Sequence, residues 1–93
     1  MDYSVEFTRS AQKEYERLNS SILPSEREAY DNTFEQLRKN PYPNAEVEGR
    51  IKKISRTDWR YTVTYRYRLV YEIRKRVVIV KRIGHRKDIY RDF

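Results

Sequence analysis

The residues of this chain best suited to chemistry are arginines, a histidine and a tyrosine in its second half. Arg60, Arg68 and Arg86 carry planar, permanently charged guanidinium groups, which can bind a phosphate through two hydrogen bonds at once. His85 and Tyr90 lie near Arg86 in sequence and can transfer a proton or stack on a base. Cleavage of RNA by its own 2′-hydroxyl needs such groups, which position the reactants, move protons and stabilise charge on the phosphate. These residues make metal-free attack on an RNA phosphodiester a candidate reaction.

Each of these residues also has an ordinary structural interpretation. Arginines on strands are often solvated or paired with a carboxylate, and Glu72 is available as a partner. A histidine next to Gly84 suits a turn, and Tyr90 suits packing of the C-terminal segment onto a sheet. For each residue taken singly, the sequence leaves both interpretations open.

Other reaction classes lack the residues that they require. The chain has no cysteine and one histidine, which excludes thiol nucleophiles, disulfides, thiolate metal sites and multi-histidine metal sites. Residues 51–93 hold only four carboxylates among 14 lysines and arginines, whose charge would repel the Mg²⁺ ions of a two-metal nuclease. Gly49 and Gly84 are the only glycines, so no loop can cradle a nucleotide phosphate, and no nucleophile elbow precedes His85. We therefore expect neither a metal nor a cofactor.

Charge is divided unevenly along the chain. Residues 1–50 have a net charge of −3 and residues 51–93 a net charge of +10, from lysine and arginine against aspartate and glutamate. Such a basic half suits a polyanion such as nucleic acid, although a solubilising surface or a dock for an acidic protein remains an alternative. The longest aliphatic run is Val77–Val80, which is too short for a membrane helix, and no secretory signal follows Met1. The expected location is the cytoplasm.

The pattern of residues 1–50 predicts one strand and two helices. Residues 3–7 alternate between apolar and polar, as in a strand with one buried face. Thr8 is a suitable N-cap for a first helix with an amphipathic stripe, and Ser25-x-x-Glu28 matches a capping box for a second. Asn40-Pro41 should end that helix, because proline cannot continue the hydrogen-bond ladder.

The pattern of the second half predicts strands. Residues 50–54 suit a short extended piece or a turn, whereas residues 59–63 and 67–73 alternate strictly between two faces. Residues 74–76 suit a turn, and Val77–Ile83 is aliphatic on both faces, as in a central strand that Gly84 would end.

These elements predict a single domain over residues 1–93 in the α+β class, with the order β-α-α-β-β-β. Two N-terminal helices would pack on one face of a small, mostly antiparallel sheet. The other face would carry Arg60, Thr62 and Arg68.

Several segments together resemble a known protein family. The tail Ile83-Gly84-His85-Arg86-Lys87-Asp88-Ile89-Tyr90-Arg91 and the segment Tyr67-Arg68-Leu69-Val70-Tyr71-Glu72-Ile73 are the most specific. Lys52-Lys53-Ile54, Trp59-Arg60 and the start Val5-x-Phe7-Thr8-x-x-Ala11-x-Lys13-Glu14 add to them in the same order. In this nearly full-length pattern the chain resembles the RelE-family toxins of toxin–antitoxin systems.

The resemblance implies a microbial-RNase-like fold and a metal-free endoribonuclease that cleaves mRNA in the ribosomal A site. It also implies a co-expressed, acidic, RelB-like antitoxin that wraps and silences the toxin in a hetero-oligomer. Arg68 and Arg86 match the family's active-site arginines, Tyr90 its C-terminal tyrosine, and Arg60 the first of two basic positions on a strand. His85 is a further catalytic candidate. Predicted RNA contacts are Lys52, Lys53, Arg66, Lys81, Arg82 and Lys87.

The chain departs from the family pattern next to Arg60. The second basic position falls at Thr62, which is neither a cation nor a general base. The turn Thr64-Tyr65-Arg66 lacks the usual glycine and is one residue longer, so a register slipped by one would bring Arg66 or Tyr61 to the site. Two other functions therefore remain alternatives: inhibition of DNA gyrase by a ParE-like relative, and nucleic-acid binding without catalysis.

Overall fold

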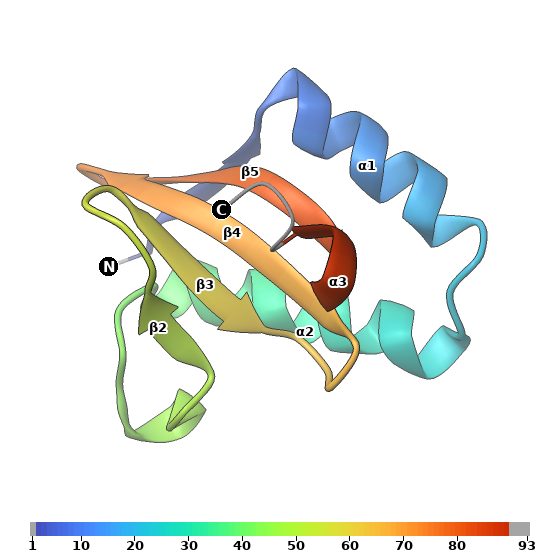
Figure 1. Ribbon diagram of the computed structural model, residues 1–93. Helices are drawn as coiled ribbons and strands as arrows, with labels where there is room; N and C mark the ends of the chain where they lie inside the picture. Colours follow the sequence, from blue (N-terminus) through green and yellow to red (C-terminus); the bar gives the residue numbers. More distant parts are fainter. Residues whose placement is uncertain (1, 90–93) are drawn as a thin grey trace.

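The computed structural model describes residues 2–89, which form one sheet flanked by helices (Figure 1). The elements are β1 (Ser4–Phe7), α1 (Arg9–Asn19), α2 (Pro24–Lys39), a 3-10 turn (Ala45–Val47), β2 (Ile51–Lys53), β3 (Asp58–Thr62), β4 (Tyr67–Arg74), β5 (Val77–His85) and α3 (Arg86–Ile89). The strand order is β1-β5-β4-β3-β2, in which β1 runs parallel to β5 and the other neighbours are antiparallel. The predicted α+β class, the mostly antiparallel sheet and the central position of β5 are confirmed.

Two elements go beyond the predicted order. Residues 51–53 form β2, a fifth strand that pairs with β3, in the segment for which a short extended piece or a turn was expected. The prediction that Gly84 ends the last strand is wrong, because Gly84 pairs with Arg68 and β5 continues to His85. The chain then forms α3, whose Ile89 side chain would lie 3.8 Å from a Cβ atom added at Gly84. Glycine therefore leaves room for α3 to pack against the strand.

The helix boundaries follow local hydrogen bonds. The predicted cap of α1 is confirmed, because Thr8 Oγ1 accepts a hydrogen bond of 3.1 Å from the Ala11 N–H. The predicted capping box at Ser25 is wrong: the N-cap of α2 is Leu23, two residues earlier, and Glu26 accepts a hydrogen bond of 2.9 Å from the Leu23 N–H. Pro24 suits the first helical position because its missing N–H would have no partner there. None of the helices in residues 2–89 has the length and apolar character that a membrane-spanning segment requires.

Aromatic rings fill the space between the helices and the sheet. Phe7, Tyr15, Tyr30 and Phe34 form edge-on or tilted pairs with centroids 5.4 to 6.2 Å apart. The hydroxyl of the buried Tyr30 donates to the carbonyl of Arg68 over 3.2 Å, so the ring is fixed at its polar end as well. Burial raises the pKa of Tyr30 far above its ordinary value, which keeps this hydroxyl protonated as a donor.

The sheet face opposite α2, here called the polar face, is organised by the register of β3, β4 and β5. Thr62, Arg68 and Gly84 pair in one row across the three strands. Thr62 and Arg68 lie on the polar face, as predicted. α3 lies on this side of the sheet, in front of it in Figure 1, and its Ile89 is fully buried, as is Val70 on β4. Part of the polar face is thus covered by α3.

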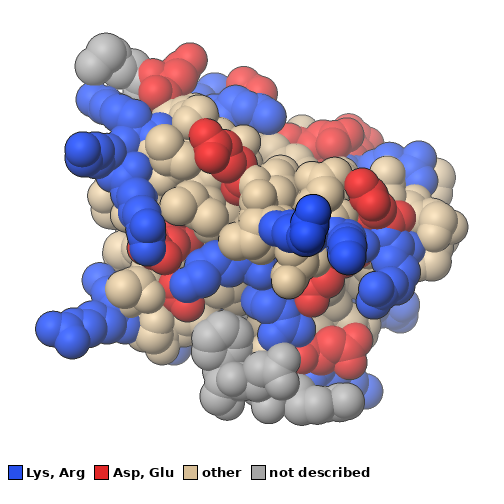
Figure 2. Space-filling view, turned by 90° about the horizontal axis from the view of Figure 1, so that it is seen from above, with Lys and Arg blue, Asp and Glu red and all other residues tan. Residues whose placement is uncertain are grey.

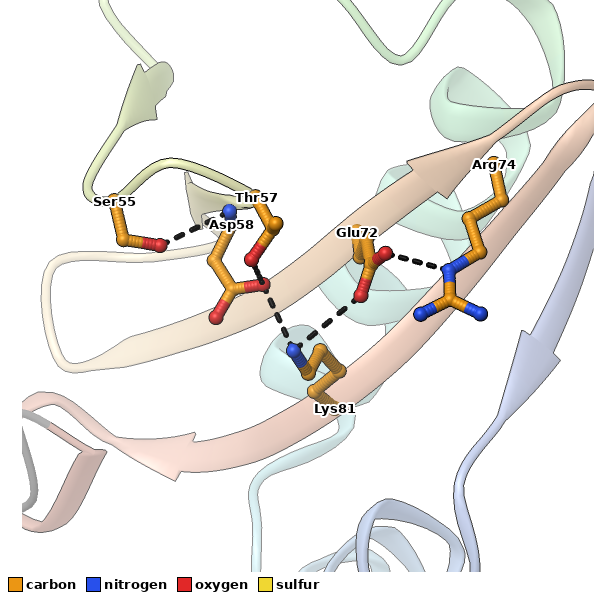
Figure 3. A network of polar contacts seen from close by, with 6 residues as sticks. All are labelled: Ser55, Thr57, Asp58, Glu72, Arg74 and Lys81. Atoms are coloured by element: carbon orange, nitrogen blue, oxygen red, sulfur yellow. Dashed lines mark hydrogen bonds and ion pairs between the residues drawn. The ribbon is translucent and has the colours of Figure 1, made fainter.

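A β-bulge separates the two halves of the polar face. Val70 pairs with Arg82 and Tyr71 pairs with Val80, which leaves Lys81 without a partner in the register. Lys81 Nζ lies 2.9 Å from Asp58 Oδ1 and 3.4 Å from Glu72 Oε1, so one lysine joins carboxylates of β3 and β4 (Figure 3). The hydrogen bond from Arg74 is the main cause that lowers the pKa of Glu72, and the bond to Asp58 raises the pKa of Lys81.

We predict that Lys81→Met destabilises the protein at neutral pH, because the opposed carboxylates of Asp58 and Glu72 lose their shared cation, with a loss reduced by the partial exposure of the lysine. The pKa of Glu72 in the parent lies below the ordinary 4.5, so its contribution is present above that pH and is lost as the pH falls through the lowered value. Arg74 supplies most of this shift and is retained in the variant, so the difference between parent and variant should shrink in acid only by the part that Lys81 supplies. Urea unfolding at neutral and acidic pH measures it.

Lys52→Met is the matched control for this prediction. Lys52 is an exposed lysine on β2, and none of the ion pairs among residues 2–89 involves it. Its removal should change the free energy of unfolding by less than about 0.5 kcal/mol. Equal losses in the two variants would contradict a role for the Lys81 pairs.

Candidate nucleic-acid interface

Arg68 binds the turn that joins β3 to β4, residues 63–66. Its side chain extends from the polar face, and only 9% of the residue is exposed. Nη1 donates to the carbonyls of Thr64, Tyr65 and Tyr67 over 2.5, 2.9 and 3.2 Å, while the buried Nε has no partner among the described residues. Arg68 therefore holds the β3–β4 turn in one conformation.

Arg86 reaches the same turn from the start of α3. Its N–H donates to the Arg66 carbonyl over 2.7 Å, which joins α3 to the turn. Its guanidinium carbon lies 4.6 Å from the centroid of the Tyr65 ring, and Nη2 lies 3.3 Å from the Tyr65 hydroxyl oxygen. The two arginines predicted for the site thus converge on one turn, Arg68 from its buried side and Arg86 from its exposed side.

Arg60 and Thr62 lie on the polar face beside this turn. Thr62 is opposite Arg68 in the register, and Arg60 Nη1 donates to Thr62 Oγ1 over 2.6 Å. Thr62 therefore orients Arg60, although it cannot replace a cation. The slipped register that would bring Tyr61 to the site is wrong, because Tyr61 pairs with Leu69 and is 4% exposed in the core.

His85 lies at the end of β5 on the other side of the strand. Its ring meets Tyr67 edge to face at 5.6 Å, and its Nδ1 accepts a hydrogen bond of 3.2 Å from the Lys87 N–H. A neutral imidazole that accepts at Nδ1 carries its proton on Nε2. His85 is thereby arranged to donate a hydrogen bond from Nε2.

A groove of about 590 Å³ runs between α1 and the end of β5, and His85 is part of its lining. Glu14 of α1 crosses it: Oε1 accepts from the Ile83 N–H over 3.0 Å, and Oε2 accepts from Arg82 Nε over 3.1 Å. β1 ends at Phe7, so Glu14 takes over as hydrogen-bond partner on the edge of β5 that faces away from β4. Arg17 of α1 adds a further cation to the groove.

The remaining predicted RNA contacts fall into different environments. Arg66 and Lys87 are exposed close to the β3–β4 turn, whereas Lys52 and Lys53 are exposed on β2. Lys53 Nζ lies 5.1 Å from the Trp59 ring centroid. Lys81 and Arg82 form ion pairs with carboxylates, as described above. Tyr90 lies outside the described residues, so its predicted place over the polar face is not tested.

Acidic side chains interrupt the basic surface. On the face seen in Figure 2, lysines and arginines gather over several elements with aspartates and glutamates between them. No group of three or more metal-binding side chains occurs within residues 2–89. On this face the basic surface is therefore mixed with acidic side chains rather than continuous.

Tyr65 is the residue near the site that the sequence analysis did not identify as functional. Tyr65 is 73% exposed, more than the other two exposed large apolar or aromatic residues of the described chain, Leu23 and Tyr42. The only signal in the sequence is an aromatic residue at a turn where the RelE pattern has glycine. Its pairing with Arg86 comes from two segments 21 residues apart and is visible only in the fold.

Comparison with known proteins places the chain in a family. Residues 5–90 match the sequence model described as the ParE toxin of a type II toxin–antitoxin system, parDE. A search of curated proteins finds no significant match.

Solved toxin structures share the fold at low sequence identity. YafQ from E. coli strain BL21(DE3) has a TM-score of 0.76 at 12% identity, over 95% of this chain and 98% of that chain. The RelB–RelE complex from Methanococcus jannaschii gives 0.69 at 22% identity, over 95% and 98%. The YoeB/ParE toxin from Agrobacterium tumefaciens gives 0.72 at 15% identity, over 88% and 97%. The RelE-like fold implied by the sequence resemblance is confirmed, and the chain belongs to the ParE toxin family of the RelE/ParE superfamily of type II toxin–antitoxin systems.

Proposed function

We propose that this toxin is a metal-independent endoribonuclease that cleaves mRNA in the ribosomal A site. The observation that carries the proposal is the convergence of Arg68 and Arg86 on the β3–β4 turn. There the Arg86 guanidinium is partly exposed, and no ion pair within residues 2–89 involves it. An unpaired guanidinium on a rigid support is suited to the charge that develops on a phosphate during cleavage.

In the proposed reaction the 2′-oxygen of the RNA attacks the adjacent phosphorus as the bond from phosphorus to the 5′-oxygen breaks. The 2′-hydroxyl gives its proton to water, and the departing 5′-oxygen takes one from water, so the products are a 2′,3′-cyclic phosphate and a 5′-hydroxyl. Arg86 binds the phosphate oxygens, and Arg60 adds positive charge from the neighbouring strand. His85 lies on the groove side of β5, from which its Nε2 is proposed to donate a hydrogen bond to a neighbouring part of the same RNA strand. Tyr90 remains a candidate for proton transfer or base stacking.

The proposed partner is an acidic, RelB-like antitoxin that forms a hetero-oligomer with this chain. Relatives of the same fold were solved as complexes named RelB–RelE and DinJ–YafQ, in which toxin and antitoxin are present together. Arg66, Arg86 and Lys87 form no ion pair within residues 2–89, so an acidic segment would gain charge complementarity there. Such a segment would cover the same surface that the proposed substrate needs.

Inhibition of DNA gyrase is the second candidate function. One observation favours it: the sequence model that matches is the ParE one. Primer extension on translated mRNA after induction of the toxin, set beside a gyrase supercoiling assay, separates the two. Site-specific breaks in mRNA with unchanged supercoiling support the ribonuclease, and the opposite pair of results supports gyrase.

We predict that Arg86→Ala lowers the rate of mRNA cleavage by about 10²–10³, because one preorganised donor to the phosphate is lost. Arg86→Lys keeps the charge without the planar fork and should recover only part of the rate. Arg56→Ala, at an exposed arginine between β2 and β3, is the control and should cleave like the parent. Parental cleavage by Arg86→Ala would contradict the assignment.

We also predict that paired and unpaired cations differ in the salt dependence of RNA binding. Each phosphate contact on single-stranded RNA contributes about −0.7 to the slope of log K against log salt. Lys87→Ala should make the slope shallower by about 0.7. Arg74→Ala, which removes an exposed arginine already bound to Glu72, should leave the slope unchanged. Fluorescence anisotropy with a labelled oligonucleotide over a salt series measures both, and identical slopes for all three proteins would argue against the assignment of Lys87.

A further inference from the structure

We propose that Tyr65 is a base-stacking residue, whose exposed ring receives an unstacked base of single-stranded RNA while Arg86 faces the adjoining phosphate. The inference rests on the proposed ribonuclease function and adds a binding residue to it. It starts from a combination that occurs at the β3–β4 turn: an aromatic ring that is 73% exposed and a guanidinium stacked 4.6 Å from its centroid.

The turn that carries Tyr65 is held from several directions. The N–H groups of Val63 and Thr64 donate to the Tyr67 carbonyl over 3.1 and 3.2 Å, and Thr64 Oγ1 accepts from the N–H groups of Arg66 and Tyr67 over 3.3 and 3.2 Å. The buried Arg68 adds its bonds to the turn's carbonyls. A ring on such a turn is ordered before a ligand arrives, which lowers the entropic cost of stacking.

The Tyr65 ring is supported on one face and open elsewhere. The Arg86 guanidinium stacks on the ring. The backbone hydrogen bond from Arg86 to Arg66 holds α3 next to the loop between β3 and β4 (Figure 1). Because most of Tyr65 remains exposed despite this contact, the ring has accessible surface for a base. A base on the ring would place its phosphate near cations, since Arg66 and Lys87 are exposed close by.

The buried charge of Arg68 argues that the conformation of this turn matters. No ion pair within residues 2–89 involves Arg68, and its Nε is buried without a partner. Burying a guanidinium against neutral carbonyls, with one donor unsatisfied, is costly for stability. The return for this cost is the pair of bonds to the carbonyls of Thr64 and Tyr65, which hold the turn and the Tyr65 ring in place. Arg68 is then a positioning residue.

Tyr42 is an exposed tyrosine without a stacked guanidinium from residues 2–89, so it can be compared with Tyr65. Its exposed fraction is 43%, and it meets Trp59 edge to face at 5.8 Å in the segment after α2. No guanidinium stacks on it among the described contacts, where Lys53 lies over Trp59 instead. Tyr42 therefore serves as a control with a similar side chain at a different place.

The test is a binding cycle with short RNA. A labelled single-stranded RNA hexamer and the same hexamer with one abasic nucleotide are titrated into the parent, Tyr65→Phe, Tyr65→Ala and Tyr42→Ala. Loss of one base–aromatic stack should weaken binding of the intact hexamer to Tyr65→Ala by about 5- to 150-fold. Tyr65→Phe and Tyr42→Ala should bind like the parent. Circular dichroism and thermal melts establish that each variant is folded.

The abasic hexamer identifies the contact as stacking. Placed at the stacked position in a scan along the hexamer, the abasic nucleotide should weaken binding to the parent but have little further effect on Tyr65→Ala. If folded Tyr65→Ala binds the intact hexamer like the parent, or if the parent binds no RNA, the stacking site is overturned.

Cleavage of translated mRNA is measured separately, so the two proposals can fail independently. If the parent stacks RNA on Tyr65 and leaves mRNA intact, the stacking inference stands and the ribonuclease proposal fails. If the parent cleaves mRNA and folded Tyr65→Ala cleaves and binds equally well, the ribonuclease stands and the stacking inference fails.

Discussion

The buried guanidinium of Arg68 is the interaction on which the candidate site depends. It joins β4 to the β3–β4 turn through the carbonyls of Thr64 and Tyr65, and the turn binds the start of α3 through the Arg86 N–H. The hydroxyl of Tyr30 holds the carbonyl of Arg68 from the helix side of the sheet. One residue therefore connects the aromatic core, the turn and α3.

The bulge at Lys81 divides the polar face into two halves with different roles. In one half, Lys81 neutralises Asp58 and Glu72, so the basic residue contributes to cohesion between β3, β4 and β5. In the other half, Arg60 bonds to a threonine hydroxyl and Arg68 to carbonyls, both neutral partners that leave the positive charge uncompensated. The excess of positive charge is thereby directed toward the β3–β4 turn and the start of α3.

Much of the fold could be predicted from the sequence, because the strands alternate with period two and the helices have local caps or stops. Thr8, Asn40-Pro41 and the residues of β4 act through neighbours in sequence, and their predicted roles in the fold are confirmed. Two boundaries were predicted wrongly. At the start of α2, the Glu26 side chain bonds the Leu23 N–H, whereas Ser25 was expected to cap the helix. At the end of β5, Gly84 continues the strand, whereas it was expected to end it. The resemblance to RelE assigned Arg68 and Arg86 to one site. Only the fold shows that Arg68 is buried and that the Arg86 guanidinium stacks on the Tyr65 ring.

The burial of Arg68 also bears on how a toxin of this fold can have either of two targets. A residue that holds a turn serves equally well a turn that binds RNA and a turn that binds another protein, so the presence of Arg68 does not by itself separate the functions. What separates them is the exposed side of the turn, where the Arg86 guanidinium and the Tyr65 ring lie against each other. A planar cation beside an open aromatic ring matches a phosphate next to a base in both charge and shape. The composition of the turn is therefore the observation that supports the proposed RNA target over the gyrase alternative.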